Sequence, residues 1–266
     1  MLCSRLFSVI IGVALGFSQA APARAENPAA LVAAASSMKF VFEDLAPTFH
    51  ARHPEFRVQF SFGSSGNIFS QVTHGAPFDI FFSADMTYPE KLAAAGQALP
   101  GAEVVPYGAG KIVLWMPSAL ALDPRAEKMN TLQDPHVRKI AIANPKHAPY
   151  GRAAIQALKR AGLYRRVQSK LILGENITQA AQFVHTGAAE AGLIALSLAR
   201  TAKMSALGTY WEVPAADYDA IRQGFLMLKG GRNPEAARAF ADFVSGPVGR
   251  EVLLRYGFKP LPGDAP

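Results

Sequence analysis

The chain has 266 residues, of which 50% are hydrophobic and 18% are charged, with a formal net charge of +7. That length and composition suit one large or two small domains with buried cores. Lys and Arg are scattered, and no basic run is longer than two residues, so nucleic acid is not expected as a partner. A mild positive charge of this kind draws anions from a distance.

Residues 1–25 have the pattern of a secretory signal peptide. Arg5 ends a short basic start, residues 6–17 form an apolar run, and Ala23-Arg24-Ala25 is an A-x-A cleavage site. The apolar run is shorter than the roughly 20 residues that a membrane-spanning helix needs, so a membrane anchor is the less favoured alternative. Cleavage before Glu26 therefore predicts a secreted protein.

Cleavage removes Cys3, the only cysteine of the chain, together with Arg5 and Arg24, which leaves +5 of the net charge of +7. The mature chain then has no disulfide, no thiolate metal ligand and no cysteine nucleophile. Core packing alone has to hold the fold together.

The first part of the mature chain alternates between strand and helix patterns. In chain order, the apolar spacing predicts a strand at 29–35, a helix at 37–52, a strand at 57–62, a helix at 67–74, a strand at 79–83 and a helix at 89–95. Alternation of this kind predicts a largely parallel α/β sheet.

A second alternating set occupies the middle of the chain, and further elements follow it. The pattern predicts strands at 111–115, 139–143, 170–173, 191–196 and 220–228, helices at 151–162, 177–186, 234–244 and 247–256, and a turn at 131–134. No long linker separates the two sets.

The two sets predict two domains joined by two crossings of the chain. Gly108 or Gly110 suits the first crossing and Gln223-Gly224 the second, because glycine tolerates backbone bending. We therefore expect one lobe from residues 26–110 and 223–266, and another from residues 111–222. Ligands of open α/β sheets bind beyond the carboxyl ends of strands, so we expect a ligand cleft between the lobes.

Four short segments rich in small or turn-forming residues each precede a predicted helix. They are residues 33–36, 63–67, 144–151 and 175–178. The start of a helix carries unpaired backbone N–H groups and a partial positive charge, so it can hold an anion without a cationic side chain. Four such starts, with serines at two of them, indicate a protein that binds an oxyanion.

Other interpretations of these residues remain open. Ser36, Ser64 and Ser65 are also ordinary helix caps. A serine hydrolase would need G-x-S-x-G, but Asn67 stands where the second glycine should be. Among the six histidines, His147 alone lies in a candidate ligand loop, as a support for that loop. No catalytic residue is predicted.

Asp79 and Asp85 flank one predicted strand and form a candidate carboxylate pair. Nothing else near them supports metal or glycosidase chemistry. A hydrogen-bonded structural role is therefore the favoured interpretation.

At this level of detail the chain resembles the periplasmic molybdate-binding proteins of ABC importers. Residues 33–36 resemble the first anion loop of that family, 63–85 the second loop and the following strand, 144–151 the third loop and 175–177 the fourth, and 246–258 resemble its C-terminal end. The resemblance implies a two-lobed type II periplasmic binding protein. Each lobe would hold a mixed, mostly parallel sheet flanked by helices, with the ligand cleft between the lobes.

The resemblance also implies a binding site. Ser36 and Ser65 would bind the anion through hydroxyl and backbone N–H groups, and Tyr150 and Ile177 through backbone N–H groups. Many members add a tyrosine hydroxyl at a position that holds Ala195 here. Ser197 would share a face with that position if the segment is extended, and so could replace the missing donor.

The ligand that the resemblance implies is molybdate or tungstate, held by the same residues without a direct bond to the metal and without a cofactor. No reaction is expected. The resemblance implies a periplasmic monomer whose partner is an ABC permease of the inner membrane. Both ions are fully deprotonated tetrahedral dianions, so a site made only of hydrogen-bond donors suffices. The alternatives are a receptor for sulfate or another tetrahedral oxyanion, and a secreted serine hydrolase.

Overall fold

The computed structural model describes residues 28–260, so the predicted signal peptide lies outside the described residues. The first lobe contains the following helices and strands: β1 (Ala30–Ala35), α1 (Lys39–Arg52), β2 (Val58–Gly63), α2 (Ser65–Thr73), β3 (Ile80–Ser83), α3 (Thr87–Ala94), β4 (Val105–Gly110), β10 (Ile221–Met227), α10 (Pro234–Ser245) and α11 (Pro247–Arg255). A 3₁₀ turn at Ser36–Met38 leads directly into α1.

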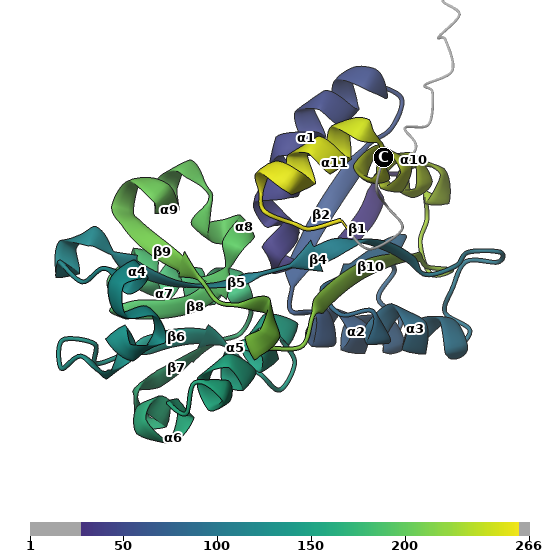
Figure 1. Cartoon of the computed structure of the whole chain (residues 1–266). Coiled ribbons are helices and arrows are strands. Elements are labelled where there is room, and N and C mark those ends of the chain that lie inside the picture. Colours follow the sequence, from purple (N-terminus) through teal and green to yellow (C-terminus); the bar gives the residue numbers. More distant parts are fainter. Residues whose placement is uncertain (1–27, 261–266) are drawn as a thin grey trace, which may run out of the picture.

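The second lobe is formed by the middle of the chain (Figure 1). Its elements are β5 (Ile112–Pro117), α4 (Pro124–Glu127), β6 (Ile140–Ala143), α5 (Pro149–Arg160), α6 (Tyr164–Val167), β7 (Leu171–Gly174), α7 (Ile177–His185), β8 (Ala191–Ala195), α8 (Leu196–Ala199), α9 (Ala202–Leu207) and β9 (Gly208–Glu212). Further 3₁₀ turns lie at Ser118–Leu120, Lys128–Gln133, Gln168–Lys170 and Ala215–Asp217. Within residues 28–260, no helix is both long and apolar enough to cross a membrane.

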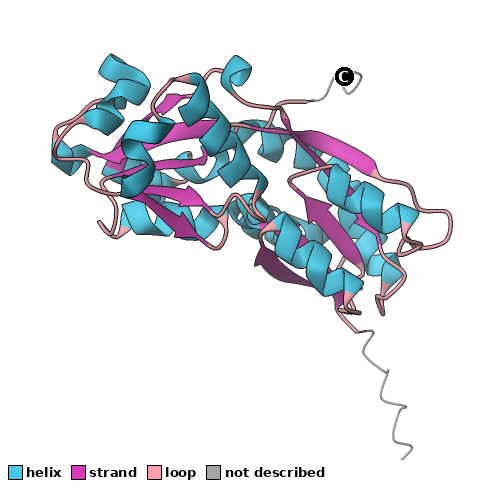
Figure 2. Ribbon diagram, turned by 90° about the horizontal axis from the view of Figure 1, so that it is seen from below, coloured by secondary structure: helices cyan, strands magenta, loops and turns pink. Residues whose placement is uncertain are grey.

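Each lobe is built on one five-stranded sheet. The strand order is β2-β1-β3-β10-β4 in the first sheet and β7-β6-β8-β5-β9 in the second. Helices lie on both faces of the sheets (Figure 2). The chain passes between the sheets from β4 to β5 and returns from β9 to β10, so two connections join the lobes.

Both sheets are mixed and mostly parallel, as predicted, because four of the five strands in each run in one direction. In the first sheet β1 pairs in parallel with β2 and β3, whereas β10 runs antiparallel to β3 and β4. The second sheet likewise has two parallel and two antiparallel pairings. The antiparallel pairings all involve β5 or β10, the strands that enter each sheet directly after a crossing from the other lobe.

The predicted strands and long helices are present, with boundaries that shift by at most two residues. The sequence did not predict β4, β9 or the short helices α4, α6, α8 and α9. Both strands lie at an edge of their sheet, and β4 carries Pro106 and two glycines, which weaken a strand pattern. Edge strands need less apolar surface than central ones, so alternation is a poor guide to them.

Two separate apolar layers stabilise the first lobe. On one face of its sheet, Phe42 of α1 packs against Phe82 and Phe240 with ring centroids 5.0 Å apart in each pair. On the other face, Ile68 of α2 and Leu92 of α3 are buried against Phe81. Burial of a large side chain of this kind contributes about 1.5–3 kcal/mol. The sheet is therefore fixed from both sides, and so are the loops that follow its strands.

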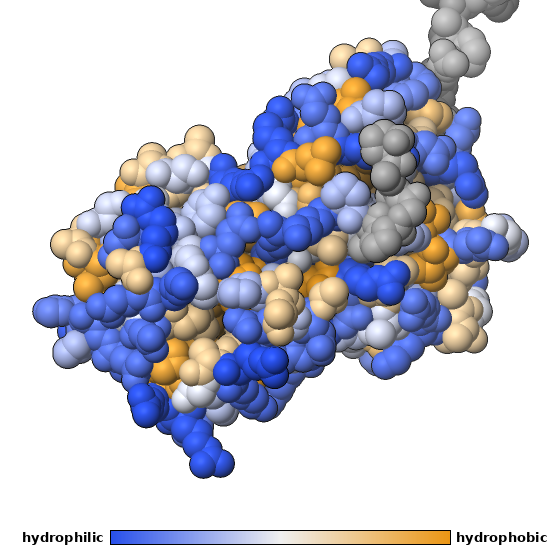
Figure 3. Space-filling view, viewed as in Figure 1, coloured by the Kyte–Doolittle hydropathy of each residue, from blue (hydrophilic) through white to orange (hydrophobic). Residues whose placement is uncertain are grey.

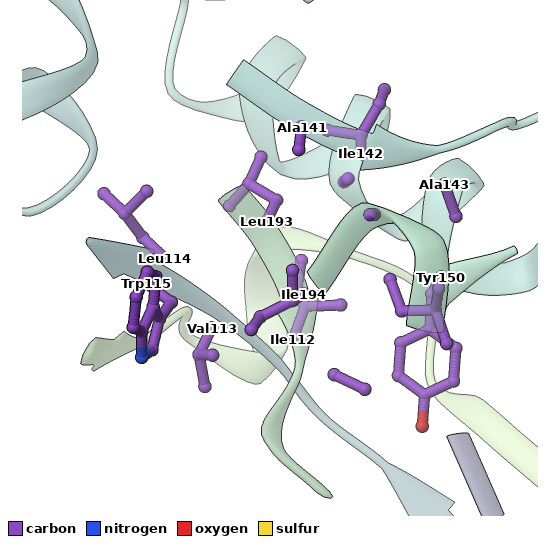
Figure 4. Packing of buried hydrophobic residues seen from close by; sticks show 14 of the residues in the cluster. Ile112, Val113, Leu114, Trp115, Ala141, Ile142, Ala143, Tyr150, Leu193 and Ile194 are labelled. Carbon is purple, nitrogen blue, oxygen red and sulfur yellow. The ribbon is translucent and has the colours of Figure 1, made fainter. Parts of the chain in front are cut away.

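The core of the second lobe is mainly aliphatic, with Trp115 fully buried in it. Ile112, Leu114, Ile142 and Leu193 extend from β5, β6 and β8 into one cluster, in which Tyr150 lies at the margin (Figure 4). The face of the molecule seen in Figure 3 is mainly hydrophilic, with small scattered groups of hydrophobic residues.

Asp79, directly before β3, is a buried structural carboxylate, as the sequence predicts. Its Oδ2 accepts from the backbone N–H of Leu31 at 2.7 Å, and its Oδ1 accepts from that of Asn233 at 2.6 Å. The side chain has no exposed surface. One carboxylate thus joins β1 to the segment that begins α10.

We predict that Asp79→Ala destabilises the protein by about 2–5 kcal/mol, because two buried N–H groups lose their acceptor. The melting temperature measured by calorimetry should fall by roughly 5–15 °C. Asp79→Asn keeps one acceptor oxygen and should lose less. The control is Asp242→Ala on the exposed side of α10, and an equal loss in that variant would contradict the prediction.

Candidate functional site

Four helix starts meet at a small cavity between the lobes. Its walls include Ser36 at the turn before α1, Ser65 at the first position of α2, Tyr150 near the start of α5 and Ile177 at the start of α7. The cavity has a volume of about 10 Å³, the room of roughly one water molecule. All four residues that the sequence singled out therefore lie around one point.

The serine hydroxyls are oriented as donors to this cavity. Ser65 Oγ accepts a hydrogen bond from the backbone N–H of Ala84 at 2.9 Å, and Ser36 Oγ accepts from that of Thr178 at 3.4 Å. Each bond occupies a lone pair of the serine oxygen, which leaves the hydroxyl hydrogen free to be donated. Ser64 is the helix cap instead, because its Oγ accepts from the N–H of Asn67 at 3.4 Å.

Backbone N–H groups add further donors. Tyr150 and Ile177 each occupy one of the first two positions of a helix, where N–H groups lack an intrahelical partner and the helix carries a partial positive charge. No charged side chain lines the cavity within the described residues. The arrangement is therefore able to hold an anion through neutral donors alone.

Sequence reasoning missed Ser37. It lines the cavity, it has no exposed surface, and its Oγ has no hydrogen-bond partner within residues 28–260. A buried hydroxyl without a partner costs free energy, so Ser37 is a further candidate contact for a bound ligand. Its position beside Ser36 in the first helical turn was the signal that could have identified it.

Ala195 and Ser197 do not line the cavity. Ala195 ends β8 and is fully buried, and α8 begins at the next residue. The segment is therefore not extended, and the expectation that both residues share one strand face is wrong. Ser197 Oγ donates to the backbone oxygen of Ser37 at 2.9 Å, so it supports the first loop from behind.

Direct contacts between the lobes close the site. His147 of the second lobe lies 2.9 Å from Ser64 Oγ through Nδ1, and its backbone oxygen accepts from the N–H of Gly66 at 2.9 Å. Arg152 of α5 forms an ion pair with Asp85. The lobes are therefore closed over the cavity, and His147 supports its wall, as the sequence predicts.

A larger cleft of about 420 Å³ adjoins the small cavity and shares Ala84 and Pro149 with it. Asp85, Glu90 and Asp219 contribute carboxylates to this cleft. Carboxylates repel anions, and these three carboxylates outnumber the two arginines of the cleft, Arg152 and Arg222, of which Arg152 is already paired with Asp85. The small cavity is therefore the better anion site.

A buried polar chain leads from the cavity into the first lobe. Tyr150 Oη accepts from Gln223 Nε2 at 2.9 Å, and Gln223 Oε1 accepts from Tyr107 Oη at 2.7 Å. Figure 4 shows the Tyr150 hydroxyl pointing away from the aliphatic core. Gly110 makes room for this contact, because a Cβ there would lie 2.1 Å from Tyr150 Oη.

Neither metal nor nucleophilic chemistry is supported. Residues 28–260 contain no group of three or more His, Cys, Asp or Glu side chains that could hold a metal ion. Ser64 and His147 are paired, but Ser64 also caps α2, and within the described residues no carboxylate bonds to His147 as a triad requires.

The fold and the donor-lined cavity between two lobes define a solute-binding protein. A family model described as bacterial extracellular solute-binding protein matches residues 30–259, and this chain belongs to that family.

Relatives of known name narrow the comparison. The molybdate-binding protein ModA of Azotobacter vinelandii is 39% identical over 228 residues, which cover 85% of this chain and 88% of the relative. ModA of Rhodobacter capsulatus is 37% identical over 201 residues, or 76% and 77% of the two chains. The solved structure of the A. vinelandii periplasmic molybdate-binding protein matches with a TM-score of 0.77 at 33% identity, covering 87% of this chain and 99% of that one.

These matches confirm the resemblance to periplasmic molybdate-binding proteins and the two-lobed type II fold. They also show that the chain is a binding component of a transport system and not an enzyme. The serine hydrolase alternative is therefore excluded.

The buried tyrosines should make stability depend on pH. Burial raises the pKa of Tyr107 well above its ordinary value, and the nearby Tyr150 raises it further. Burial also raises the pKa of Tyr150, although interactions with Ser37 and Gln223 oppose the rise. The unfolded chain loses these protons near pH 10, whereas the folded protein keeps them.

The free energy of unfolding should therefore fall as the pH rises above about 10, and this contribution should be constant below that pH. Denaturant unfolding of wild type and Tyr150→Phe at about pH 9 and pH 11 tests this, and the variant should lose less stability between the two. Parallel losses would show that Tyr150 does not contribute.

Proposed function

We propose that this protein is the periplasmic receptor of an ABC importer and that it binds molybdate or tungstate. The observation that supports the proposal most is the convergence of Ser36, Ser65, Tyr150 and Ile177 on one closed cavity with no charged lining residue. The ModA relatives are named for binding molybdate. In this proposal the hydroxyls of the two serines and the backbone N–H groups of all four residues hold the anion.

A cavity of donors favours an anion that carries no proton. Molybdate, tungstate and sulfate each present four acceptor oxygens at neutral pH, whereas hydrogen phosphate brings a hydrogen that needs an acceptor. The orientations of Ser36 Oγ and Ser65 Oγ offer donors instead. Because sulfate has the same charge and shape as molybdate, size has to separate these two ions.

Binding between lobes also explains the two crossings of the chain. We propose lobes of residues 26–110 with 223–266, and of residues 111–222, that close around the ion, whose oxygens accept hydrogen bonds from donors of both lobes. Because the closed cavity has the room of roughly one water molecule, the lobes would stand slightly further apart around the larger ion. The signal peptide at 1–25 would direct export to the periplasm. There the closed monomer would present its ion to a permease of the inner membrane, and the permease would receive it when the lobes open.

The proposal predicts the order of oxyanions in a thermal-shift experiment on the mature protein. Molybdate and tungstate should raise the melting temperature more than equal concentrations of sulfate or phosphate, because a ligand that binds only the folded state stabilises it. If sulfate raises the melting temperature as much as molybdate or more, the proposed ligand is wrong and sulfate takes its place, whereas the description of the fold is not affected.

The serine hydroxyls should contribute measurably to affinity. A hydrogen bond to a charged group contributes about 1.5–3 kcal/mol, so Ser36→Ala should weaken molybdate binding roughly tenfold to a hundredfold in calorimetry. Ser65→Ala should lose at least as much, because the bond that Ser65 Oγ accepts from the Ala84 N–H is 2.9 Å, shorter than the 3.4 Å bond that Ser36 Oγ accepts from Thr178.

Ser70→Ala, on the exposed side of α2, is the matched control and should bind like wild type. Unfolding without ligand separates a binding defect from a folding defect. If Ser36→Ala loses stability but keeps its affinity, the residue is a structural cap and the proposed site is wrong at that position.

A further inference from the structure

Ser37 differs from the other cavity serines in how its hydroxyl is oriented. Ser36 and Ser65 each accept from a backbone N–H, which fixes them as donors to the cavity. Ser37 Oγ is fully buried, lines the same cavity and has no partner of ordinary geometry within residues 28–260. A hydroxyl left to itself can rotate and present either its hydrogen or its lone pairs to a ligand.

The neighbour of Ser37 that can fix its direction is Tyr150. Both residues line the same cavity of about 10 Å³, and Ser37 lowers the pKa of Tyr150 against the larger rise that burial causes. Tyr150 Oη already accepts a hydrogen bond from Gln223 Nε2 at 2.9 Å. Its own hydrogen is therefore free to be donated, and Ser37 Oγ on the same cavity is a buried oxygen that has no partner within residues 28–260.

The amide of Gln223 decides the direction of this chain. Its Oε1 lies 2.7 Å from Tyr107 Oη, whereas the alternative acceptor for the same hydroxyl, the backbone oxygen of Ser83, lies 3.4 Å away. Tyr107 therefore donates to the amide oxygen, which turns the NH₂ group of Gln223 toward Tyr150. The opposite orientation of the amide would make Tyr150 donate to Gln223 and leave Ser37 without a donor.

The surroundings hold Gln223 in place. The side chain is fully buried, and it lies at the irregularity in the β10–β4 pairing between Gln223 and Gly224. A Cβ at Gly110 would approach Gln223 Nε2 to 2.6 Å, so only glycine leaves room for the amide beside Tyr150. The chain of hydrogen bonds thus begins where the two lobes are joined and ends at the cavity.

We propose that Gln223, acting through Tyr150, holds the Ser37 hydroxyl as a donor to the bound oxyanion, and that this makes the site reject oxyanions that carry a proton. Gln223 is a positioning residue here, since it lies behind the cavity wall. The inference rests on the proposed function and adds the residues that separate molybdate from hydrogen phosphate. When the chain is broken, Ser37 can turn and accept the hydrogen of hydrogen phosphate.

The experiment measures dissociation constants of wild type, Tyr150→Phe and Gln223→Met for molybdate, sulfate and inorganic phosphate by calorimetry at mildly alkaline pH. In both variants, the ratio of the phosphate constant to the molybdate constant should fall about tenfold, the value of one directed hydrogen bond. The ratio of sulfate to molybdate should stay within about threefold, because neither ion carries a proton. The double variant, Tyr150→Phe with Gln223→Met, should change the phosphate-to-molybdate ratio little more than either single variant does, because both substitutions interrupt the same chain of hydrogen bonds.

Tyr218→Phe is the matched control. Tyr218 is also buried and its hydroxyl accepts from the backbone N–H of Ile112 at 3.3 Å, but it does not line the cavity. Its removal should leave both ratios unchanged.

If Gln223 has only a structural role, Gln223→Met should weaken the binding of all three ions alike and leave both ratios unchanged. That result would overturn the inference. If wild type prefers molybdate and the variants keep its preference over phosphate, the inference fails and the proposed function stands. If wild type binds none of the three ions, the proposed function fails, and the inference with it.

Discussion

An anion held without a cation requires several N–H and O–H donors that point at one place, and much of this fold serves that requirement. The starts of α2, α5 and α7 and the turn before α1 supply such donors, and each follows a strand or loop fixed by a buried layer. Two of the starts lie in each lobe. The site is therefore complete only when the lobes meet.

Closure also settles the direction of the donors. Ser36 Oγ receives its hydrogen bond from Thr178 of the opposite lobe, so the same contact that joins the lobes orients a serine toward the cavity. Tyr150 likewise reaches across to Gln223. Binding and closing are thus linked by shared hydrogen bonds, and an ion that fits both lobes stabilises the closed form through differential affinity.

Neutral donors give a selectivity that a cationic site would not give. A lysine or arginine attracts any dianion, whether or not it carries a proton. A hydroxyl whose oxygen already accepts a hydrogen bond from the protein has one lone pair fewer for a ligand and turns its hydrogen toward the cavity, so a protonated oxyanion makes one less favourable contact. In this protein the backbone N–H groups of Ala84 and Thr178 occupy two of these oxygens, and the Gln223 chain is proposed to occupy the third.

The sequence by itself determined the α/β alternation, the two crossings and the four segments around the cavity, because apolar periodicity and small residues before helices are local signals. The reversed direction of β5 and β10 and the edge strands β4 and β9 were decided by long-range pairing, which no local pattern encodes. Tertiary structure alone revealed the unpartnered hydroxyl of Ser37, the helical position of Ser197 and the partner of Tyr150. Those features depend on which distant residues meet, as with Tyr150 and Gln223, which are 73 positions apart in the chain.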